Sequence, residues 1–318
     1  MAPLPIENNT ITFAERPSRG PISSTTFRQQ RSPIQPLQDG QVLVQIDYIS
    51  IDPTMRIWLN GARSYLEPIK IGAVMRAAGI GRVVDSRSRM TAYFGVFDIG
   101  RLKDSETIVV SGAAGSVGLV NLALPTVSPL LFPLIVAQIA LSLSKCTVVA
   151  IAGSSEKCAS LEALGCQVVL NYKDHDFKKS LRKVGLVDVF FDNVGGEILD
   201  IVLGQLKPYA RVVACGAISA YNAERSYGVR NTPNLVAMKA KIEGFIVLDY
   251  ARRYPEARAY LADLRNKGKI MYEYTVLGPE DGKSGLERCV EGLEAVLAGR
   301  NFGKTLIKVS EEERESKL

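Results

Sequence analysis

The central part of the chain, from Thr107 to about residue 248, alternates short apolar runs with longer segments of helical periodicity. The apolar runs are nearly continuous, which is typical of strands covered on both faces of a parallel sheet. They read TIVVSG, CTVVAIAG, CQVVLNY, DVFFDNVGG, ARVVACGAIS and KIEGFIVL. The helical segments between them include SEKCASLEALG and EILDIVLGQLKP. This alternation predicts a doubly wound α/β domain.

The two ends of the chain follow a different pattern and predict a second, β-rich region. QVLVQIDYISI at 41–51 alternates apolar and polar residues, and AGIGRVVDS at 78–86 reads as a strand that starts with glycine. From about Lys269 the chain returns to a strand, KIMYEYTVLG, a helix, GLERCVEGLEAVLAG, and a strand, KTLIKVS. We therefore expect domain boundaries after residues 94 and 268, with residues 269–318 packing back on residues 1–94.

A glycine-rich turn follows the first strand of the central region. Gly112, Gly115 and Gly118 have the spacing G-x-x-G-x-x-G, and the next predicted strand is CTVVAIAG. Glycines in this place let a pyrophosphate approach the backbone at the start of a helix. The sequence therefore predicts a Rossmann domain that binds a dinucleotide.

The end of the second strand indicates which dinucleotide binds. A site for NAD has an acidic residue there that accepts from the ribose 2′-hydroxyl, but this chain has Gly153-Ser154-Ser155 and then Lys157. A lysine can pair with a 2′-phosphate, so NADPH is the expected cofactor. The alternative is that Lys157 is an ordinary lysine in the first turn of a helix.

The stretch after the glycine turn is longer than a dinucleotide site needs. Gly118 and Gly153 are 35 residues apart, whereas about 20 are usual between the turn and the end of the second strand. The extra chain carries three prolines, which a continuous helix does not tolerate: Pro125, Pro129 and Pro133. We interpret residues 119–134 as an insertion and expect the crossover helix to start near Ile135.

Composition and charge exclude several classes of protein. The chain has 318 residues, 47% hydrophobic and 23% charged, and its net charge of +6 is scattered; the densest basic run, KKSLRK at 178–183, has helical spacing. We therefore expect no nucleic-acid partner. No charge occurs between Glu106 and Lys145, long enough for a membrane span, but the prolines there and the soluble-fold signature argue against one.

The cysteines and the single histidine, His175, argue against zinc. The five cysteines have no C-x-x-C spacing, so neither a disulfide framework nor a zinc site is indicated. With one histidine and no cysteine pair, the ligand set of a zinc alcohol dehydrogenase cannot be assembled. The cysteine usage indicates a reducing compartment.

Several motifs in one order resemble a known family. TAYFGVFDIGRLKDSETIVVSGAAGSVG, YKDHDF, VFFDNVGGEILD, ACGAISAYN and NFGKTLIKV are similar to those of the zinc-independent medium-chain dehydrogenase/reductases, in the branch of prostaglandin reductases, leukotriene B4 12-hydroxydehydrogenases and alkenal double-bond reductases. The resemblance implies a GroES-like catalytic domain beside the Rossmann domain and a homodimer. It also implies NADPH-dependent reduction of a carbon–carbon double bond conjugated to a carbonyl, without a metal. A quinone reductase of the same superfamily and a non-catalytic, decayed nucleotide-binding protein are the alternatives.

The resemblance also implies the site residues. For the pyrophosphate these are Gly115, Ser116 and Val117, within the turn Gly112 to Gly118; for the 2′-phosphate, Gly153, Lys157 and Tyr172; near the nicotinamide, Asn193, Asn301 and Gly303. Tyr221 in GAISAYN resembles the active-site tyrosine, and a surface loop tyrosine is the alternative. Hydride addition to an enone needs a donor for the developing enolate oxygen, and Tyr221 and the ribose hydroxyl of the cofactor are the expected donors.

The sequence departs from the pattern of this family at two places, and its last three residues carry a further signal. In YISIDPTMRIW, Thr54 stands where the family usually has tyrosine. GRVVDSRSRMTAYFG joins a strand directly to the helix before the Rossmann domain, so the GroES-like domain is expected to be truncated near residues 87–89. The chain ends in Ser316-Lys317-Leu318, which matches the peroxisomal import signal read by a receptor; a chance tripeptide is the alternative.

Overall fold

A computed structural model describes residues 7–17, 20–23, 25–34, 46–61, 66–80, 87–114, 135–143, 145–270, 274–301 and 303–309. The chain forms two compact units. The first comprises Met1–Val83, Thr275–Asn301 and Thr305–Leu318, and the second comprises Val84–Tyr274 and Phe302–Lys304. The boundaries expected after residues 94 and 268, and the truncation expected near 87–89, stay predictions.

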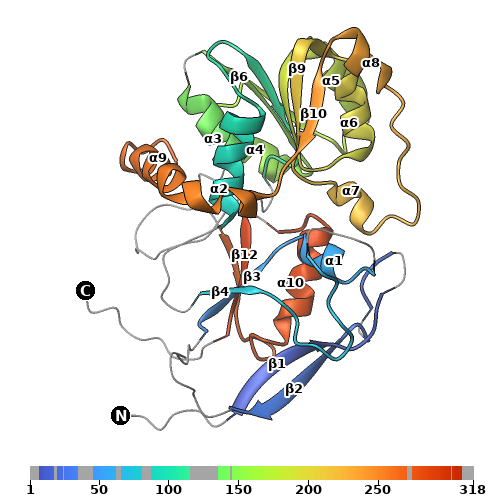
Figure 1. The fold of residues 1–318 in the computed structure, drawn as a ribbon, viewed down its shortest axis with the longest axis vertical. Coiled ribbons are helices and arrows are strands. Elements are labelled where there is room, and N and C mark those ends of the chain that lie inside the picture. The colour runs from blue at the N-terminus through green and yellow to red at the C-terminus, as the bar shows by residue number, and fades with distance from the viewer. Residues whose placement is uncertain are drawn as a thin grey trace. The chain divides into compact units, whose positions relative to one another are not determined.

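Six parallel strands form the sheet of the second unit (Figure 1). They are β5 (Thr107–Val110), β6 (Thr147–Ala152), β7 (Val168–Asn171), β8 (Val187–Asp192), β9 (Leu206–Ala214) and β10 (Lys241–Gly244). Their order across the sheet is β10-β9-β8-β5-β6-β7. The chain therefore starts in the middle, winds outward to β7 and crosses back to β8, which confirms the doubly wound prediction. The winding reverses between β5 and β8.

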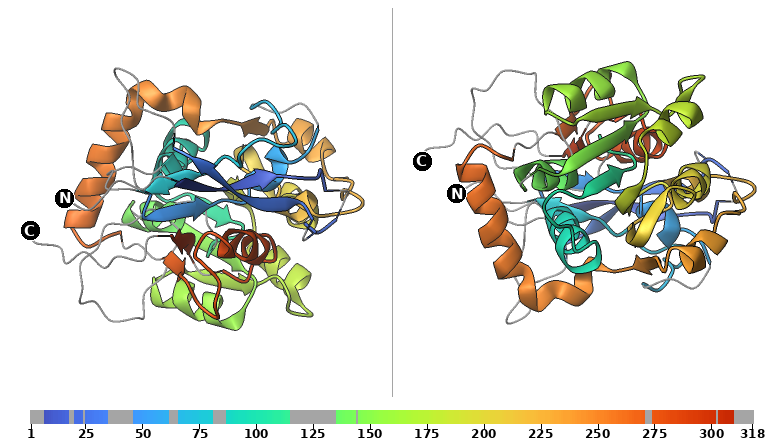
Figure 2. Two further views of the ribbon diagram at one scale, coloured as in Figure 1. Left: turned by 90° about the horizontal axis from the view of Figure 1, so that it is seen from below. Right: turned by 90° about the horizontal axis from the view of Figure 1, so that it is seen from above.

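Helices cover both faces of this sheet (Figure 2). One face carries α3 (Ile135–Ser142), α4 (Ser155–Ala163), α2 (Arg87–Phe94) and α9 (Tyr254–Asn266), and the other carries α5 (Phe177–Lys183) and α6 (Gly196–Leu203). Successive residues of β5 point to opposite faces: Ile108 and Val110 belong to the first core and Val109 to the second. A strand buried on both sides needs apolar residues at every position, and the sequence shows this.

Helix α3 occupies the place expected for the crossover helix. Its Ile135, Val136 and Ile139 are fully buried, as predicted for a helix that packs on the sheet. The predicted insertion, 119–134, lies outside the described residues. The lysines and the arginine of the basic run at 178–183 are exposed on α5, and the buried side of this helix is formed by Phe177 and Leu181.

Shorter elements complete the second unit. They are the π-helical turn η1 (Gly95–Ile99), α7 (Ile218–Tyr221), α8 (Pro233–Ala237) and the 3-10 helix η2 (Val247–Arg253). The Tyr93 hydroxyl donates to Glu256 Oε1 at 2.8 Å and so ties α2 to α9. Among the residues that the structure describes, no helix is long and apolar enough to span a membrane.

The first unit is built from two small sheets. β1 (Glu7–Phe13) and β2 (Phe27–Pro33) pair antiparallel, and a second sheet has the order β11-β12-β3-β4. Its strands are β11 (Tyr274–Leu277), β12 (Lys304–Lys308), β3 (Tyr48–Ile51) and β4 (Ala78–Ile80); α1 (Met55–Trp58) and α10 (Arg288–Leu297) are its helices. Phe13, Ile51 and Leu293 share its core. The strand, helix and strand predicted after Lys269 are therefore present.

Two predicted elements end earlier than the sequence pattern indicates. EILDIVLGQLKP reads as one helix, but α6 ends at Leu203, and Leu206 already pairs with Val187 of β8. The intervening Gly204 and Gln205 make the turn, since Gln205 N–H donates to Val202 O at 2.9 Å. KIEGFIVL reads as one strand, but β10 stops at Gly244 and the chain then enters η2.

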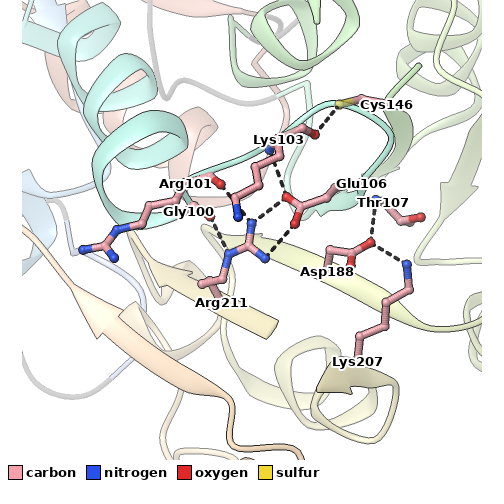
Figure 3. A network of polar contacts seen from close by, with 9 residues as sticks. All are labelled: Gly100, Arg101, Lys103, Glu106, Thr107, Cys146, Asp188, Lys207 and Arg211. Atoms are coloured by element: carbon pink, nitrogen blue, oxygen red, sulfur yellow. Dashed lines mark hydrogen bonds and ion pairs between the residues drawn. The ribbon is translucent and has the colours of Figure 1, made fainter. Parts of the chain in front are cut away.

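A charged network holds the amino ends of the central strands (Figure 3). Arg211 donates through Nη1 and Nη2 to the two carboxylate oxygens of Glu106, at 2.9 and 2.5 Å, and through Nε to Gly100 O at 2.7 Å. Lys207 Nζ lies 2.6 Å from Asp188 Oδ2. These ion pairs and hydrogen bonds lie at the amino ends of the strands. Ligands of such folds bind at the other end, outside the carboxyl ends of the strands.

Candidate cofactor site

The point where the winding reverses is formed by the residues that follow β5 and β8. Gly112, directly after β5, has φ +60, which side-chain-bearing residues rarely adopt, and a Cβ there would lie 3.4 Å from Val194 Cγ2 and 3.7 Å from Asn193 Cβ. The backbone conformation therefore favours glycine at this position, whereas the space beside it would admit a methyl group. This agrees with the predicted place of Gly112 at the start of the phosphate-binding turn.

Three buried polar residues join these strand ends. Ser111 Oγ donates to Asp192 Oδ1 at 2.9 Å and accepts from Asn193 N at 3.0 Å, and Asn193 Nδ2 donates to Ser111 O at 2.8 Å. Asp192 Oδ1 also accepts from the backbone N–H groups of Val194 and Gly195, at 3.0 and 2.9 Å. Burial raises the pKa of Asp192, although these hydrogen bonds oppose the rise.

One buried atom of this group, Asn193 Oδ1, is without a hydrogen-bond partner in the described part of the chain. Buried acceptors are normally satisfied, and an exception is a mark of a binding function or of an ordered water. Asn193 Oδ1 therefore suits a ligand that presents an N–H or O–H group.

Tyr221 lies close to Asn193. It ends α7, and its hydroxyl oxygen accepts from Ala217 N at 3.3 Å. Helix α7 is attached to the turn after β8, because Ser219 Oγ donates to Val194 O at 2.6 Å. A Cβ on Gly216 would lie 3.0 Å from Asn193 O and 3.5 Å from the Tyr221 hydroxyl. The structure thus brings Tyr221 to the carboxyl ends of β8 and β9, beside Asn193.

A second cluster lies at the carboxyl ends of β6 and β7. Tyr172 covers Gly153, and Lys173 Nζ lies 5.9 Å from the centre of the Tyr172 ring. Ser154 caps α4 by accepting from Lys157 N at 3.3 Å. The pKa of Lys157 is lowered by burial and then by the positive charge of Lys173. Lys157 in the first turn of α4 and Lys173 after β7 supply two positive charges that suit a phosphate group, with Glu156 as the one acidic residue of that first turn.

The remaining predicted residues are Asn301, Gly303 and four residues of the glycine turn. Gly115, Ser116, Val117 and Gly118 lie outside the described residues. Asn301 is buried within the first unit, and Gly303, with φ +58, belongs to the second. Their assignment to the nicotinamide stays a prediction.

Sequence reasoning missed Ser111, Asp192 and Lys173. Asp192 opens DNVGG and Lys173 follows Tyr172 in YKDHDF, so both stood inside recognised motifs. Ser111 carried no signal of its own, because its partners are 81 and 82 residues away along the chain. Across the described ranges, no group of three His, Cys, Asp or Glu side chains is placed to hold a metal ion.

The residues fit NADPH on three observations of this structure. Asn193 Oδ1 is a buried acceptor without a partner among the described residues, Gly112 has the left-handed backbone conformation that suits a glycine turn, and Lys157 lies close enough to Lys173 for the two charges to interact. Lys157, Lys173 and Tyr172 would hold the 2′-phosphate end, and Asn193 and Tyr221 lie where the nicotinamide end is expected.

Comparisons with known proteins agree with this fit. A family model described as the N-terminal domain of oxidoreductase matches residues 9–113, and one described as zinc-binding dehydrogenase matches residues 134–263. The NADPH-dependent curcumin reductase of Escherichia coli is 30% identical over 358 residues, covering 95% of this chain and 97% of that protein. The NADP(+)-dependent 2-alkenal reductase of Nicotiana tabacum is 36% identical over 227 residues, covering 70% and 60%.

A solved structure extends the similarity to three dimensions. CurA from Vibrio vulnificus, in complex with NADPH, is 29% identical, with a TM-score of 0.81; the match covers 96% of this chain and all 100% of that one. The alignment with the Escherichia coli protein is longer than the 318 residues of this chain, so that protein has residues that this chain lacks.

Proposed function

The chain belongs to the zinc-independent medium-chain dehydrogenase/reductases, in the branch of the prostaglandin and alkenal reductases, and we propose that it reduces a carbon–carbon double bond conjugated to a carbonyl group. It is an oxidoreductase, and its cofactor is NADPH. The proposal concerns the substrate class: an alkenal or an enone.

The observation that carries the proposal is the place of Tyr221. Its hydroxyl lies beside Asn193 at the carboxyl ends of the central strands, where the reacting end of a dinucleotide is expected in this fold. Among the relatives, one is a 2-alkenal reductase and another a curcumin reductase. A tyrosine donor near the cofactor and relatives that reduce unsaturated carbonyl compounds support the same chemistry.

The expected chemistry uses few protein groups. NADPH, when bound, supplies the hydride, which adds to the β-carbon. Negative charge then develops on the carbonyl oxygen, and a positioned hydrogen-bond donor lowers the energy of that state. A phenol hydroxyl can accept one hydrogen bond and donate another, so Tyr221 can accept from Ala217 N and donate to the substrate oxygen. Water protonates the α-carbon, which completes the saturated carbonyl product.

Replacing Tyr221 by phenylalanine tests the proposal. We expect Tyr221→Phe to lower turnover of an α,β-unsaturated ketone by about 100-fold, the usual scale for one such donor, and to change NADPH affinity little. Tyr209→Phe is the matched control, because Tyr209 is 64% exposed on β9 and should keep full activity. A chelator should have no effect. Unchanged turnover in Tyr221→Phe, or an equal loss of NADPH affinity, would contradict the role of Tyr221.

We further infer a homodimer, as the family resemblance implies. β10 is one of the two edge strands of the six-stranded sheet, and it exposes Ile242; Val236 of α8 and Tyr209 of β9 are also exposed on the second unit. An uncovered edge strand with apolar side chains is a surface for pairing with another strand. Light scattering should give twice the chain mass, and Ile242→Lys should give the single mass. A monomeric wild-type protein would remove the dimer.

Peroxisomal import is the last part of the proposal. Ser316-Lys317-Leu318 lies outside the described residues and rests on the sequence alone. A fluorescent protein fused ahead of residue 1 should give puncta that coincide with a peroxisomal marker, and removing the last three residues should release it. Diffuse fluorescence from both versions would remove the peroxisome from this account.

A further inference from the structure

Ser111 contacts Asn193 through two different atoms. Its carbonyl oxygen accepts from the side-chain Nδ2 of Asn193 at 2.8 Å, and its hydroxyl oxygen accepts from the backbone N of Asn193 at 3.0 Å. Ser111 is fully buried and lies directly after β5. Asn193 lies directly after β8. One residue thus fixes both the main chain and the amide of Asn193.

These contacts determine which way the Asn193 amide faces. An asparagine amide can be turned by half a rotation, which exchanges its oxygen and nitrogen. The Ser111 carbonyl is an acceptor only, so it selects the orientation in which Nδ2 faces Ser111 and Oδ1 faces away. In the described part of the chain, Oδ1 then has no partner. The unsatisfied atom is therefore a consequence of the position of Ser111.

Asp192 holds the Ser111 hydroxyl in turn. Asp192 Oδ1 accepts from Ser111 Oγ at 2.9 Å, which directs the hydroxyl proton to the carboxylate and leaves an oxygen lone pair for Asn193 N. The same Oδ1 accepts from Val194 N and Gly195 N, so the carboxylate is itself fixed. Buried polar groups linked in this way can hold one arrangement firmly.

We propose that Ser111 is a positioning residue that presents Asn193 Oδ1 to a hydrogen-bond donor on the nicotinamide half of NADPH. The donor is the carboxamide N–H or a ribose O–H, which share the chemistry that Oδ1 requires. Ser111 acts through Asn193 and does not itself contact the cofactor. The inference rests on NADPH as cofactor and is independent of the proposed carbonyl substrate.

Gln205 provides a matched comparison within the same unit. It is also a buried amide whose nitrogen is held by backbone carbonyls, at 3.0 Å from Leu181 O and 2.9 Å from Gly185 O, and whose Oε1 has no partner among the described residues. It lies directly before β9 and so at the amino ends of the strands, whereas Asn193 follows the carboxyl end of β8. Gln205→Leu removes similar hydrogen bonds away from the cofactor site.

The test is a double-mutant cycle on NADPH binding, measured by fluorescence titration without carbonyl substrate. Ser111→Ala keeps the backbone carbonyl that faces Asn193 Nδ2 and removes the hydroxyl that links Asp192 to Asn193 N. We expect Ser111→Ala and Asn193→Ala each to raise the dissociation constant of NADPH about 10-fold, the size of one buried hydrogen bond, and the double variant to bind no more weakly than Asn193→Ala alone. Gln205→Leu should lower the melting temperature and leave the dissociation constant unchanged. A dissociation constant about 100-fold above wild type in the double variant, the product of the two single effects, would overturn the proposal.

Two further arms keep the test decisive. If Ser111→Ala does not fold, Ser111→Cys replaces it; this variant fills similar space with a weaker hydrogen-bonding group and should weaken binding part of the way, whereas wild-type affinity would overturn the proposal. Reduced 3-acetylpyridine adenine dinucleotide phosphate lacks the carboxamide N–H. If the wild-type protein binds NADPH more tightly than this analogue and Asn193→Ala does not, the donor is the carboxamide. If both proteins discriminate equally between the two cofactors, and Asn193→Ala still binds NADPH more weakly than wild type, the donor is the ribose hydroxyl.

The outcome separates this inference from the proposed function. NADPH binding that follows the cycle, in a protein that reduces no enone, would contradict only the substrate class. If the protein reduces an enone but Ser111→Ala binds NADPH as tightly as wild type, only the positioning role of Ser111 is contradicted.

Discussion

The ring of Tyr172 lies directly against Gly153: a Cβ at position 153 would be 2.5 Å from ring carbon Cε1 and 2.8 Å from the hydroxyl oxygen. Tyr172 is 45% exposed, so its ring can move aside. We expect Gly153→Ala to fold with a nearly unchanged melting temperature but to displace Tyr172 and weaken NADPH binding. Titration of NADPH checks this, and Gly244→Ala is the control, because a Cβ there would meet only Ala214 O at 3.8 Å. Unaltered affinity in Gly153→Ala would separate Tyr172 from the cofactor.

Lys157 should select NADPH over NADH. It stands at the start of α4 beside Lys173, where no acidic residue ends β6. We expect Lys157→Ala to lose about 1 to 3 kcal/mol of binding free energy for NADPH, the scale of a charge-assisted hydrogen bond, and little for NADH. Calorimetric titration of both cofactors measures the difference. Equal losses for the two would show that Lys157 does not contact the 2′-phosphate.

The same lysine predicts a pH dependence. Burial, and then the charge of Lys173, lower the pKa of Lys157, so its ammonium loses its proton at a lower pH than an ordinary lysine does. NADPH affinity should therefore decline on the alkaline side before other lysines titrate. Lys157→Arg, whose guanidinium stays charged, should flatten this decline. A decline of the same shape in Lys157→Arg would assign it to another group.

Much of the fold was predictable because the signals are local. The strand runs, the helix from Ile135 and the glycine at 112 follow from periodicity and spacing, and all three are present. The early end of α6 carried a local signal that the prediction passed over, because Gly204 follows the last helical residue and Pro208 stands shortly beyond it. That the next residues form a strand depends on the pairing of Leu206 with β8. Likewise Ser111 looks like any small residue after a strand. Its role arises from contacts across more than 80 residues of chain.

Asp200 should stabilise the segment after α7 in a pH-dependent way. Its carboxylate accepts from Arg230 N at 2.7 Å, Asn231 N at 2.8 Å and the Tyr227 hydroxyl at 3.1 Å. Burial alone would raise the pKa of Asp200, but these hydrogen bonds, together with the Arg230 charge, lower it overall.

A lowered folded-state pKa means that this stabilisation is present above the unfolded value, about 3.9, and is lost as pH falls through the folded value. Amide hydrogen exchange at Arg230 and Asn231 should therefore lose protection in acid in the wild type. In Asp200→Ala, protection should be low at every pH. Ser160→Ala is the control, because the hydroxyl of this half-buried helix serine donates only to Glu156 O within its own helix among the described contacts. Full protection in Asp200→Ala would contradict the assignment.

Removing residues 119–134 should raise the solubility of the protein and its affinity for NADPH. The two family models match residues 9–113 and 134–263 and so leave residues 114–133 unmatched, which overlaps the predicted insertion. Three prolines at four-residue spacing, each costing about 3 kcal/mol inside a helix, separate the glycine turn from α3. Joining Gly118 to Ile135 should raise both solubility and NADPH affinity. A deletion variant that binds NADPH more weakly than the full chain would contradict the insertion.

The central claim is that this chain transfers hydride from NADPH to the β-carbon of an unsaturated carbonyl compound. The most direct measurement is to supply NADPH deuterated at the transferred position, with an alkenal or an α,β-unsaturated ketone, and to locate the deuterium in the product by NMR. The account predicts a saturated carbonyl compound with deuterium on the β-carbon and solvent hydrogen on the α-carbon. Deuterium on the carbonyl carbon, giving an unsaturated alcohol, or NADPH oxidation only with quinones would contradict it.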